Sequence, residues 1–479
     1  MMKGLSHDEH QHVAAGALIA REGLLPYVDF PFFHTPYLPY LYALLFSFSD
    51  HLLLTARLFT VTTVSATVAL VATVGWQLFR PRGRTSAAFV AGGMVLLCVS
   101  THLFSDTVGY AWNHEPPVLF VLAAFLAHLA GLRQEQGFWF GVSGVLLGVA
   151  VGMRLTYAPL VAPFGLALLL LLPRPRWRPR LLIWFAAGLL AGSAGIFYFF
   201  IRAPEQAFFG NFEFARVNIV YRFSTGEPRT MTVLTKLRYF FKEIIRSDFP
   251  FFIGTIFLAL APWLSRSGTH PFRREIRLIC LMLPFLLVGA FAPSPLFNQY
   301  FYPLVPFLAL LALYSLASIP KISPWSRRSS GFAALAVLFS VVLGARGYRD
   351  YADFFSPSKW ATLESHARGG ELNAHLPSGR ILTLAPIHAL EAGLEIYPSF
   401  VTGPIAWRVS PFLAPAKAEQ LGMITPTALE SVLVQAAPDG ILVGFEETGE
   451  DPLISFAKAN GYQRHKLEAK TELWIKRAP

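Results

Sequence analysis

Residues 52–79 read LLLTARLFTVTTVSATVALVATVGWQLF and contain a single charged residue, Arg57. An apolar run of this length is typical of a helix that crosses a lipid bilayer, which needs about 20 residues. Further apolar runs follow along the chain, at residues 86–103, 117–132, 138–153, 156–172, 181–201, 248–264, 278–292, 301–319 and 331–345. The pattern predicts an α-helical polytopic membrane protein with about ten transmembrane helices.

The composition of the chain supports the same class. Of 479 residues, 54% are hydrophobic and 14% are charged, whereas soluble domains usually carry about 25% charged residues. Mean hydropathy is +0.47. These values exclude a disordered chain, a collagen, a coiled coil and an ordinary cytosolic enzyme. Cys98 and Cys280, the two cysteines, lie inside apolar runs, which excludes a disulfide framework and a cysteine zinc site.

Charge divides the chain near residue 345. Residues 346–479 hold 13 basic and 15 acidic residues, while residues 1–345 hold 27 basic and 14 acidic residues. The tail also lacks long apolar runs, so we expect a membrane domain over 1–345 and a soluble domain over 346–479. Strand-like runs in the tail, RILTLA, GILVGF and ELWIK, alternate with helical patterns. This alternation predicts a small C-terminal α/β domain.

The basic residues between the apolar runs predict the orientation. With the N-terminus outside and the runs alternating, 15 of them fall in inner loops, against the acids Glu135 and Glu275. They are Arg80, Arg82, Arg84, Arg133, Arg174, Arg176, Arg178, Arg180, Arg266, Arg273, Arg274, Arg277, Lys321, Arg327 and Arg328. This asymmetry follows the positive-inside pattern. It predicts that loops 1–51 and 203–247 and the tail lie outside. The net charge of +11 is then explained by the basic residues of the inner loops. We therefore expect no nucleic-acid partner.

The stretch HDEHQH at residues 7–12 gathers groups that could carry chemistry. A helix starting here would set Asp8 and His12 on one face, because residues four apart are neighbours on a helix. A carboxylate and an imidazole together can abstract a proton or hold a divalent metal. The alternative is a capped, solvated start of a helix.

Three longer stretches carry a resemblance to a known family. They are Asp8-Glu9 followed by EGLLPYVDFPFFHTPYLPY at 22–40, TARL at 55–58, and NQYFYPLVPFL at 298–308. Together they resemble the outer-face motifs of GT-C membrane glycosyltransferases, and the protein mannosyltransferase and aminoarabinose transferase group above all. That group places a transmembrane helix before its acidic pair, so we expect a further helix upstream of Met1.

The resemblance implies an activity. Such an enzyme takes a sugar from a polyprenyl-phosphate donor at the extracytoplasmic face of the bacterial inner membrane, with inversion. The acceptor is a lipid, a glycan or a protein, and the enzyme also contacts membrane lipids. The acidic pair, Asp8 and Glu9, is implied to be catalytic, with Asp8 as the general base. The resemblance names no certain cofactor and leaves a divalent metal open.

Other residues are candidates for binding. His34, Arg154, Gln299 and Tyr300 would bind the donor and its phosphate, since relatives often carry a cation near His34 and a charge at the depth of Arg154 is costly unless it functions. His12 and Glu115 could bind a metal or the acceptor. The alternatives are snorkelling for Arg154, an interfacial histidine for His34, aromatic packing at 299–300 and a plain polar loop around Glu115. Arg57 would cap a helix or pair with Asp50.

Two other functions fit the composition. A transporter or flippase of a lipid-linked or small polar substrate would also be polytopic, but such proteins often carry internal repeats and mid-membrane acids. No repeat is evident, and the acids of residues 1–345 lie at the ends of apolar runs or between them. An oligosaccharide polymerase or ligase would share the lipid-linked substrate. The basic loop 203–247 could attract anionic lipid head groups or form an amphipathic surface helix.

Overall fold

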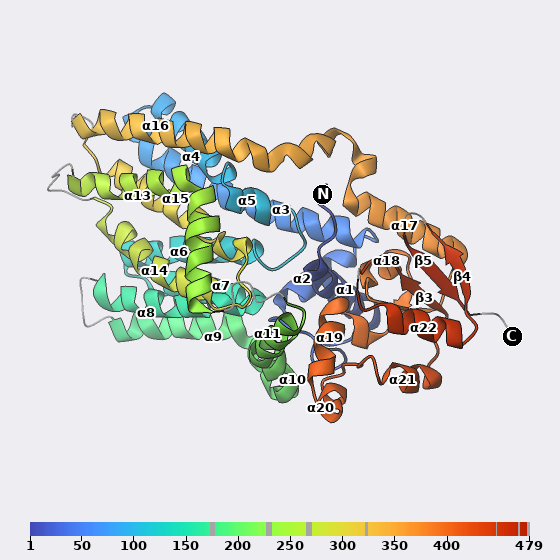
Figure 1. The fold of residues 1–479 in the computed structure, drawn as a ribbon. Helices are drawn as coiled ribbons and strands as arrows, with labels where there is room; N and C mark the ends of the chain where they lie inside the picture. The colour runs from blue at the N-terminus through green and yellow to red at the C-terminus, as the bar shows by residue number, and fades with distance from the viewer. Residues whose placement is uncertain are drawn as a thin grey trace.

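The computed structural model describes residues 1–172, 178–226, 232–264, 271–320, 324–446, 448–467 and 470–476. Arg174, Arg176, Arg266 and Lys321, four of the basic residues assigned to inner loops, lie outside the described residues. The described residues form a long helical bundle joined at one end to a small sheet domain (Figure 1).

Each predicted apolar run coincides with a helix of the bundle. These helices are α3 (Leu52–Phe79), α4 (Arg84–Val99), α6 (Pro116–Gln134), α7 (Gly137–Met153), α8 (Val161–Leu170), α9 (Arg178–Arg202), α13 (Phe249–Leu264), α14 (Arg273–Phe291), α15 (Leu304–Ala317) and α16 (Pro324–Gly344). Within the described residues, five helices are long and apolar enough to cross a membrane, or six if a pair bent by 90° counts as one span. The predicted number of ten spans is therefore not confirmed.

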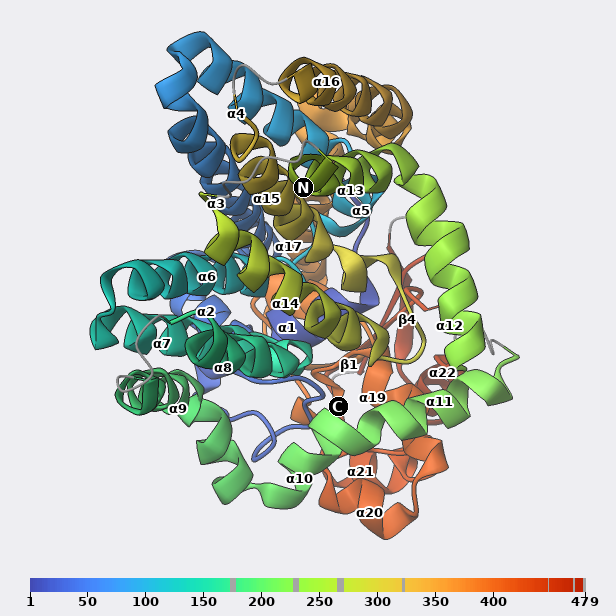
Figure 2. The same cartoon turned by 90° about the vertical axis from the view of Figure 1, so that its left-hand side faces the viewer.

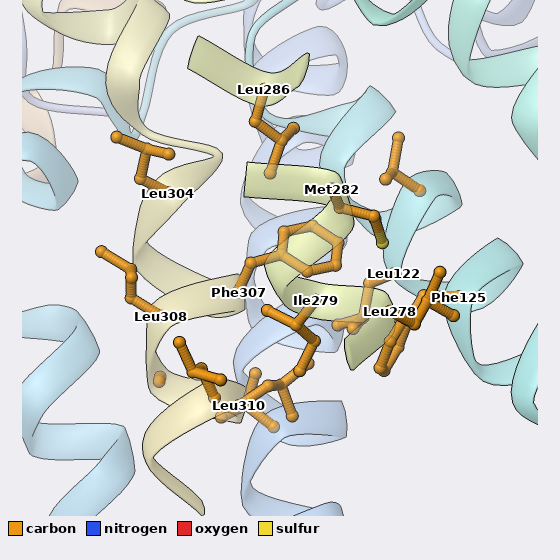
Figure 3. Packing of buried hydrophobic residues seen from close by; sticks show 14 of the residues in the cluster. Leu122, Phe125, Leu278, Ile279, Met282, Leu286, Leu304, Phe307, Leu308 and Leu310 are labelled. Atoms are coloured by element: carbon orange, nitrogen blue, oxygen red, sulfur yellow. The ribbon is translucent and has the colours of Figure 1, made fainter. Parts of the chain in front are cut away.

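The centre of the bundle is α15. Its candidate span is 89% buried, whereas that of α16 is 11% buried and lies at the edge of the bundle (Figure 2). Leucine and phenylalanine side chains of α15 pack against α14 and α6, as Figure 3 shows for Phe307, Met282 and Phe125. Elsewhere α7 and α9 approach closely through glycines: a Cβ at Gly188 would lie 2.0 Å from the carbonyl oxygen of Gly141. Small residues at such contacts are typical of helices that pack within a bilayer.

The basic loops meet at one end of the bundle. Arg82 donates to the carbonyl oxygens of Ala317 and Ile319 at 2.6 and 2.8 Å. Arg133 pairs with Glu275 at 2.6 Å. These contacts join loops that are distant in sequence, and the N-terminal segment and the tail lie at the opposite end (Figure 1). Which end faces the cytoplasm stays a prediction from the loop charges.

The N-terminal segment forms α1 (His7–Glu22) and α2 (Tyr37–Phe46). Ser6 caps α1 in a capping box with Glu9, and Gly23 ends it in the left-handed conformation, as helix termini commonly do. Most of α1 is buried although its first turns are polar, because the helix lies between the bundle and the tail (Figure 1).

The described parts of the region 203–247, residues 203–226 and 232–247, consist mainly of short helices. They are α10 (Pro204–Phe208), the π-helical turn η4 (Phe209–Glu213), α11 (Phe214–Ser224), α12 (Val233–Tyr239) and the π-helical turn η5 (Phe240–Ile245). On α12 and η5 the apolar side chains of Val233, Leu234, Leu237 and Phe241 are exposed. The exposed basic residues Arg238, Lys242 and Arg246 alternate with them. The segment therefore exposes both apolar and basic side chains.

The tail begins with η7 (Ala345–Phe355) and α17 (Ala361–His375) and contains a five-stranded sheet of order β2-β1-β3-β5-β4. Its strands are β1 (Arg380–Thr383), β2 (Glu395–Ile396), β3 (Gly440–Val443), β4 (Gln463–Lys466) and β5 (Glu472–Ile475). Strand β1 is parallel to β2 and β3, with Ile381 opposite Gly440, and β5 is antiparallel to both β3 and β4. Thus β1, β3 and β5 are the three strands expected from the sequence.

The sheet domain contacts α1, α3 and α11 of the rest of the molecule. The remaining helices are α5 (His102–Thr107) in the bundle and α18 (Pro386–Glu391), α19 (Pro404–Val409), α20 (Pro415–Gln420), α21 (Leu429–Gln435) and α22 (Asp451–Ala459) in the tail. Helix α18 packs on α1. Val13 and Leu18 of α1 belong to the same buried apolar cluster as Ile381 of β1 and Ile387 of α18.

Candidate active site

A cavity of about 1340 Å³ opens where α1, the bundle and the tail meet. Most of the residues that the sequence singles out line it: Asp8, His12, His34, Arg154, Gln299 and Tyr300. Glu9 and Glu115 do not line it. The residues that line the cavity come from eight separate stretches of the chain.

Asp8 lies in the first turn of α1 and is partly exposed to the cavity. His12, one turn later, lines the same cavity, as expected for residues four apart on a helix. Burial raises the pKa of the Asp8 carboxyl, and the nearby charges of Arg154 and Arg222 oppose that shift. A carboxylate with a raised pKa is a better proton acceptor than an ordinary aspartate.

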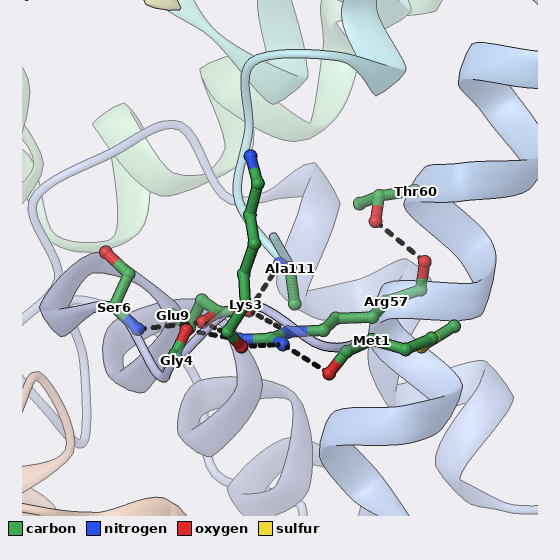
Figure 4. A network of polar contacts seen from close by, with 8 residues as sticks. All are labelled: Met1, Lys3, Gly4, Ser6, Glu9, Arg57, Thr60 and Ala111. Atoms are coloured by element: carbon green, nitrogen blue, oxygen red, sulfur yellow. Dashed lines mark hydrogen bonds and ion pairs between the residues drawn. The ribbon is translucent and has the colours of Figure 1, made fainter. Parts of the chain in front are cut away.

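Glu9 faces the other way and is fully buried in an ion pair with Arg57 (Figure 4). One carboxylate oxygen accepts from Arg57 Nε at 2.7 Å and from the Ala111 amide at 2.6 Å. The other accepts from Arg57 Nη2 at 2.7 Å and from the Ser6 amide at 2.9 Å. Arg57 also donates to the carbonyl oxygens of Lys3 and Gly4.

These contacts correct two expectations. Arg57 pairs with Glu9 and not with Asp50, because the guanidinium points into the N-terminal segment. Both oxygens of Glu9 are used by hydrogen bonds, so its position does not support a catalytic role. It serves to fasten α1 to α3.

Arg154 follows α7 and is 8% exposed. It donates to Asn113 Oδ1 at 2.6 Å and to Thr156 Oγ1 at 3.1 Å, and its guanidinium lies 5.0 Å from the ring centre of Tyr300. Among the described residues, no acid forms an ion pair with it. A buried cation whose partners are neutral favours the binding of an anion beside it.

Three of the histidines that line the cavity, His12, His34 and His114, are uncharged at neutral pH. Burial, followed by the charge of Arg154, lowers the pKa of His34 to about 3. Burial also lowers the pKa values of His12 and His114 well below the usual range. His34 therefore lines the cavity as a neutral imidazole, and its expected role in donor binding stays a prediction. Its ring stacks on that of His12 at 5.1 Å between centroids, and His114 stacks on Tyr300 at 5.4 Å.

Glu115 lies at the start of α6 and is fully buried. Burial raises its pKa well above the usual range, and its carboxyl is close to Trp112 and Gly109 rather than on the cavity. Among the described residues, no group of three or more His, Cys, Asp or Glu side chains is arranged to hold a metal ion. His12 and Glu115 are thus not members of such a group.

Sequence reasoning missed the contribution of the tail. Arg408 of α19 and Glu446, which follows β3, line the cavity together with Arg222 of α11. Asn113 and His114 also line it, and they hold Arg154. No spacing or motif signals that residues beyond 400 would return to the first helix, because that contact depends on how the tail docks.

Solved structures resemble this fold over nearly its whole length. ArnT from Cupriavidus metallidurans bound to undecaprenyl phosphate is 12% identical with a TM-score of 0.61, and the match covers 100% of this chain and 95% of that chain. Its apo form is 13% identical with a TM-score of 0.61, covering 99% and 94%.

The apo Archaeoglobus fulgidus oligosaccharyltransferase is 12% identical with a TM-score of 0.52, covering 95% of this chain and 67% of that one. The chain has the GT-C fold. No protein-family model and no curated protein matches its sequence. The GT-C fold confirms the resemblance seen in the motifs, and it places the cavity in a scaffold shared with glycosyltransferases.

Proposed function

We propose that this protein is a membrane glycosyltransferase that moves a sugar from a polyprenyl-phosphate donor to an acceptor hydroxyl. The observation that carries the proposal is one cavity with Asp8, a proton acceptor, and Arg154, a buried cation that forms no ion pair with an acid of the described chain. The GT-C fold adds support, since one of the similar structures holds undecaprenyl phosphate.

The chemistry divides between these two side chains. Arg154 binds the donor phosphate and stabilises the charge that it gains as it leaves. Gln299 and Tyr300 lie beside Arg154 and contact the donor. Because a phosphate leaves readily, no acid has to protonate it. Asp8 accepts the proton of the acceptor hydroxyl while the hydroxyl oxygen forms a bond to the anomeric carbon of the sugar. The bond from that carbon to the phosphate oxygen breaks, and its electron pair stays with the phosphate. Attack opposite the phosphate inverts the anomeric centre.

We propose that the reaction occurs at the extracytoplasmic face of a bacterial inner membrane. Support comes from the arginines that gather at the end of the bundle opposite the cavity, at Arg82, Arg133 and Arg274. Loops rich in basic residues tend to remain cytoplasmic. The acceptor, a lipid, a glycan or a protein, would approach from the side of the tail.

The proposal can be tested with purified protein in lipid vesicles. Polyprenyl-phosphate sugars carrying different hexoses and pentoses are supplied with an acceptor extract, and the release of free polyprenyl phosphate is measured. A glycosyltransferase releases polyprenyl phosphate and transfers the sugar to the acceptor with inversion of the anomeric centre. If the protein moved the intact donor between leaflets without cleaving it, the activity would be that of a flippase and the proposal would be wrong.

The raised pKa of Asp8 predicts the pH dependence of transfer. A general base must be ionised, so kcat should fall about tenfold per pH unit below the pKa of Asp8. Since that pKa lies above the ordinary aspartate value, the fall should begin at higher pH than it would for an exposed aspartate near 3.9. Measuring kcat from acidic to neutral pH, with folding monitored in parallel, checks this; a flat profile would contradict it.

A further inference from the structure

The tail reaches the catalytic helix through one carboxylate. Glu446, whose side chain is 4% exposed, accepts a hydrogen bond from Arg408 in an ion pair. Its other oxygen lies 3.2 Å from Nδ1 of His7. His7 is the first residue of α1 and precedes Asp8. His7, Asp8, Arg408 and Glu446 all line the same cavity. We call the contact from Arg408 through Glu446 to His7 the tail bridge.

The loop that carries Glu446 is held firmly by the sheet domain. The Glu450 carboxylate accepts from the amide of Gly444 at 2.6 Å and from that of Glu446 at 3.3 Å. Gly444 has a φ of +104°, and a Cβ there would lie 2.4 Å from the Lys470 carbonyl oxygen. The ring of Phe445 stacks on His388 of α18 at 4.3 Å. The position of the Glu446 carboxylate is therefore set by the tail and not by α1.

The electrostatic surroundings of His7 include two arginines as well as Glu446. Burial, with the charges of Arg408 and Arg222, lowers the pKa of His7. His7 Nδ1 nevertheless lies 3.2 Å from the Glu446 carboxylate, so the contact is held by geometry. The opposite side of the same helical turn is held by Glu9 and Arg57. Two carboxylates thus fix the turn that carries Asp8, one from within α1 and one from the tail.

We propose that Glu446 is a positioning residue for Asp8, so that the tail completes the active centre by holding the base in place. This inference rests on the proposed function. Misplacing a catalytic group by about 1 Å can cost about 100-fold in rate. Loss of the bridge should therefore lower kcat without destroying the fold, because His7 is half-exposed and the Glu9–Arg57 pair remains.

The test compares Glu446→Gln, His7→Ala and the double variant in the full-length protein. Each single change should lower kcat by about 10–100-fold with the donor KM little changed. The double variant should be no slower than the worse single one, since both remove the same contact. Amide hydrogen exchange should increase in residues 7–12. Glu395→Gln is the matched control, because it breaks an exposed Arg–Glu pair of the same sheet, away from the cavity.

The outcomes separate the bridge from the function. Additive losses in the double variant, or reduced thermal stability with unchanged kcat, would overturn the positioning role. Unchanged amide exchange in residues 7–12 would reject the bridge itself. If the wild type released no polyprenyl phosphate from any donor, the proposed function would fail, and the catalytic role of the bridge would fail with it, even where exchange showed that the contact exists.

Discussion

Replacing Asp8 with Asn should lower sugar transfer by about 10²–10⁴-fold, the usual contribution of a single general base. The amide keeps the shape of the side chain but cannot take the proton of the acceptor hydroxyl. Donor binding should change little, because Arg154 and its neutral partners stay in place. Turnover and binding of the polyprenyl-phosphate sugar, measured on the same preparation, check both halves of the expectation.

Glu22→Gln is the matched control for Asp8→Asn. Glu22 is an exposed acid in the last turn of the same helix, so its neutralisation should leave transfer unchanged. If folded Asp8→Asn protein turned over at the wild-type rate, a different group would be the base. The cavity would then need another proton acceptor among its lining residues.

Replacing Glu9 with Gln should strongly destabilise the protein. The change leaves the Arg57 guanidinium fully buried without its counter-charge, and breaking a buried ion pair from one side typically costs about 3–5 kcal/mol. Thermal unfolding in detergent should show a large fall in Tm. Replacing both partners by apolar residues, Glu9→Leu with Arg57→Met, should recover part of the loss, since no unpaired charge then remains.

Arg380→Gln provides the comparison for Glu9→Gln. Arg380 pairs with Glu395 on the surface of the tail, where such pairs contribute about 0–1 kcal/mol. Equal falls in Tm for Glu9→Gln and Arg380→Gln would contradict the structural role of Glu9.

Much of the bundle follows from patterns that depend only on neighbouring residues. Long apolar runs predict helices because the backbone must satisfy its hydrogen bonds internally in lipid, and short apolar runs between helical patterns predict β1, β3 and β5. Strands β2 and β4 escape this reasoning, since β2 covers only Glu395–Ile396 and β4 reads Gln-Arg-His-Lys. These two strands are defined by their hydrogen bonds to neighbouring strands, which no pattern of adjacent residues predicts.

The site was predictable to a similar degree. The sequence nominated Asp8, His34, Arg154, Gln299 and Tyr300, and all five line one cavity, while their roles stay predictions. They could not tell Asp8 from its neighbour Glu9, because which acid faces the cavity depends on Arg57, 48 residues away. Glu446 was beyond prediction for the same reason, since its contact joins the first helix to a loop near the other end of the chain.

The apolar cluster that α1 shares with β1 and α18 has a consequence for how the protein is made. Helix α1 precedes the bundle in the chain, whereas Ile381 and Ile387, which belong to the same apolar cluster, follow it. The contacts between α1 and the tail can therefore form only after the intervening bundle has been synthesised, so the end of the molecule that holds the cavity is assembled late.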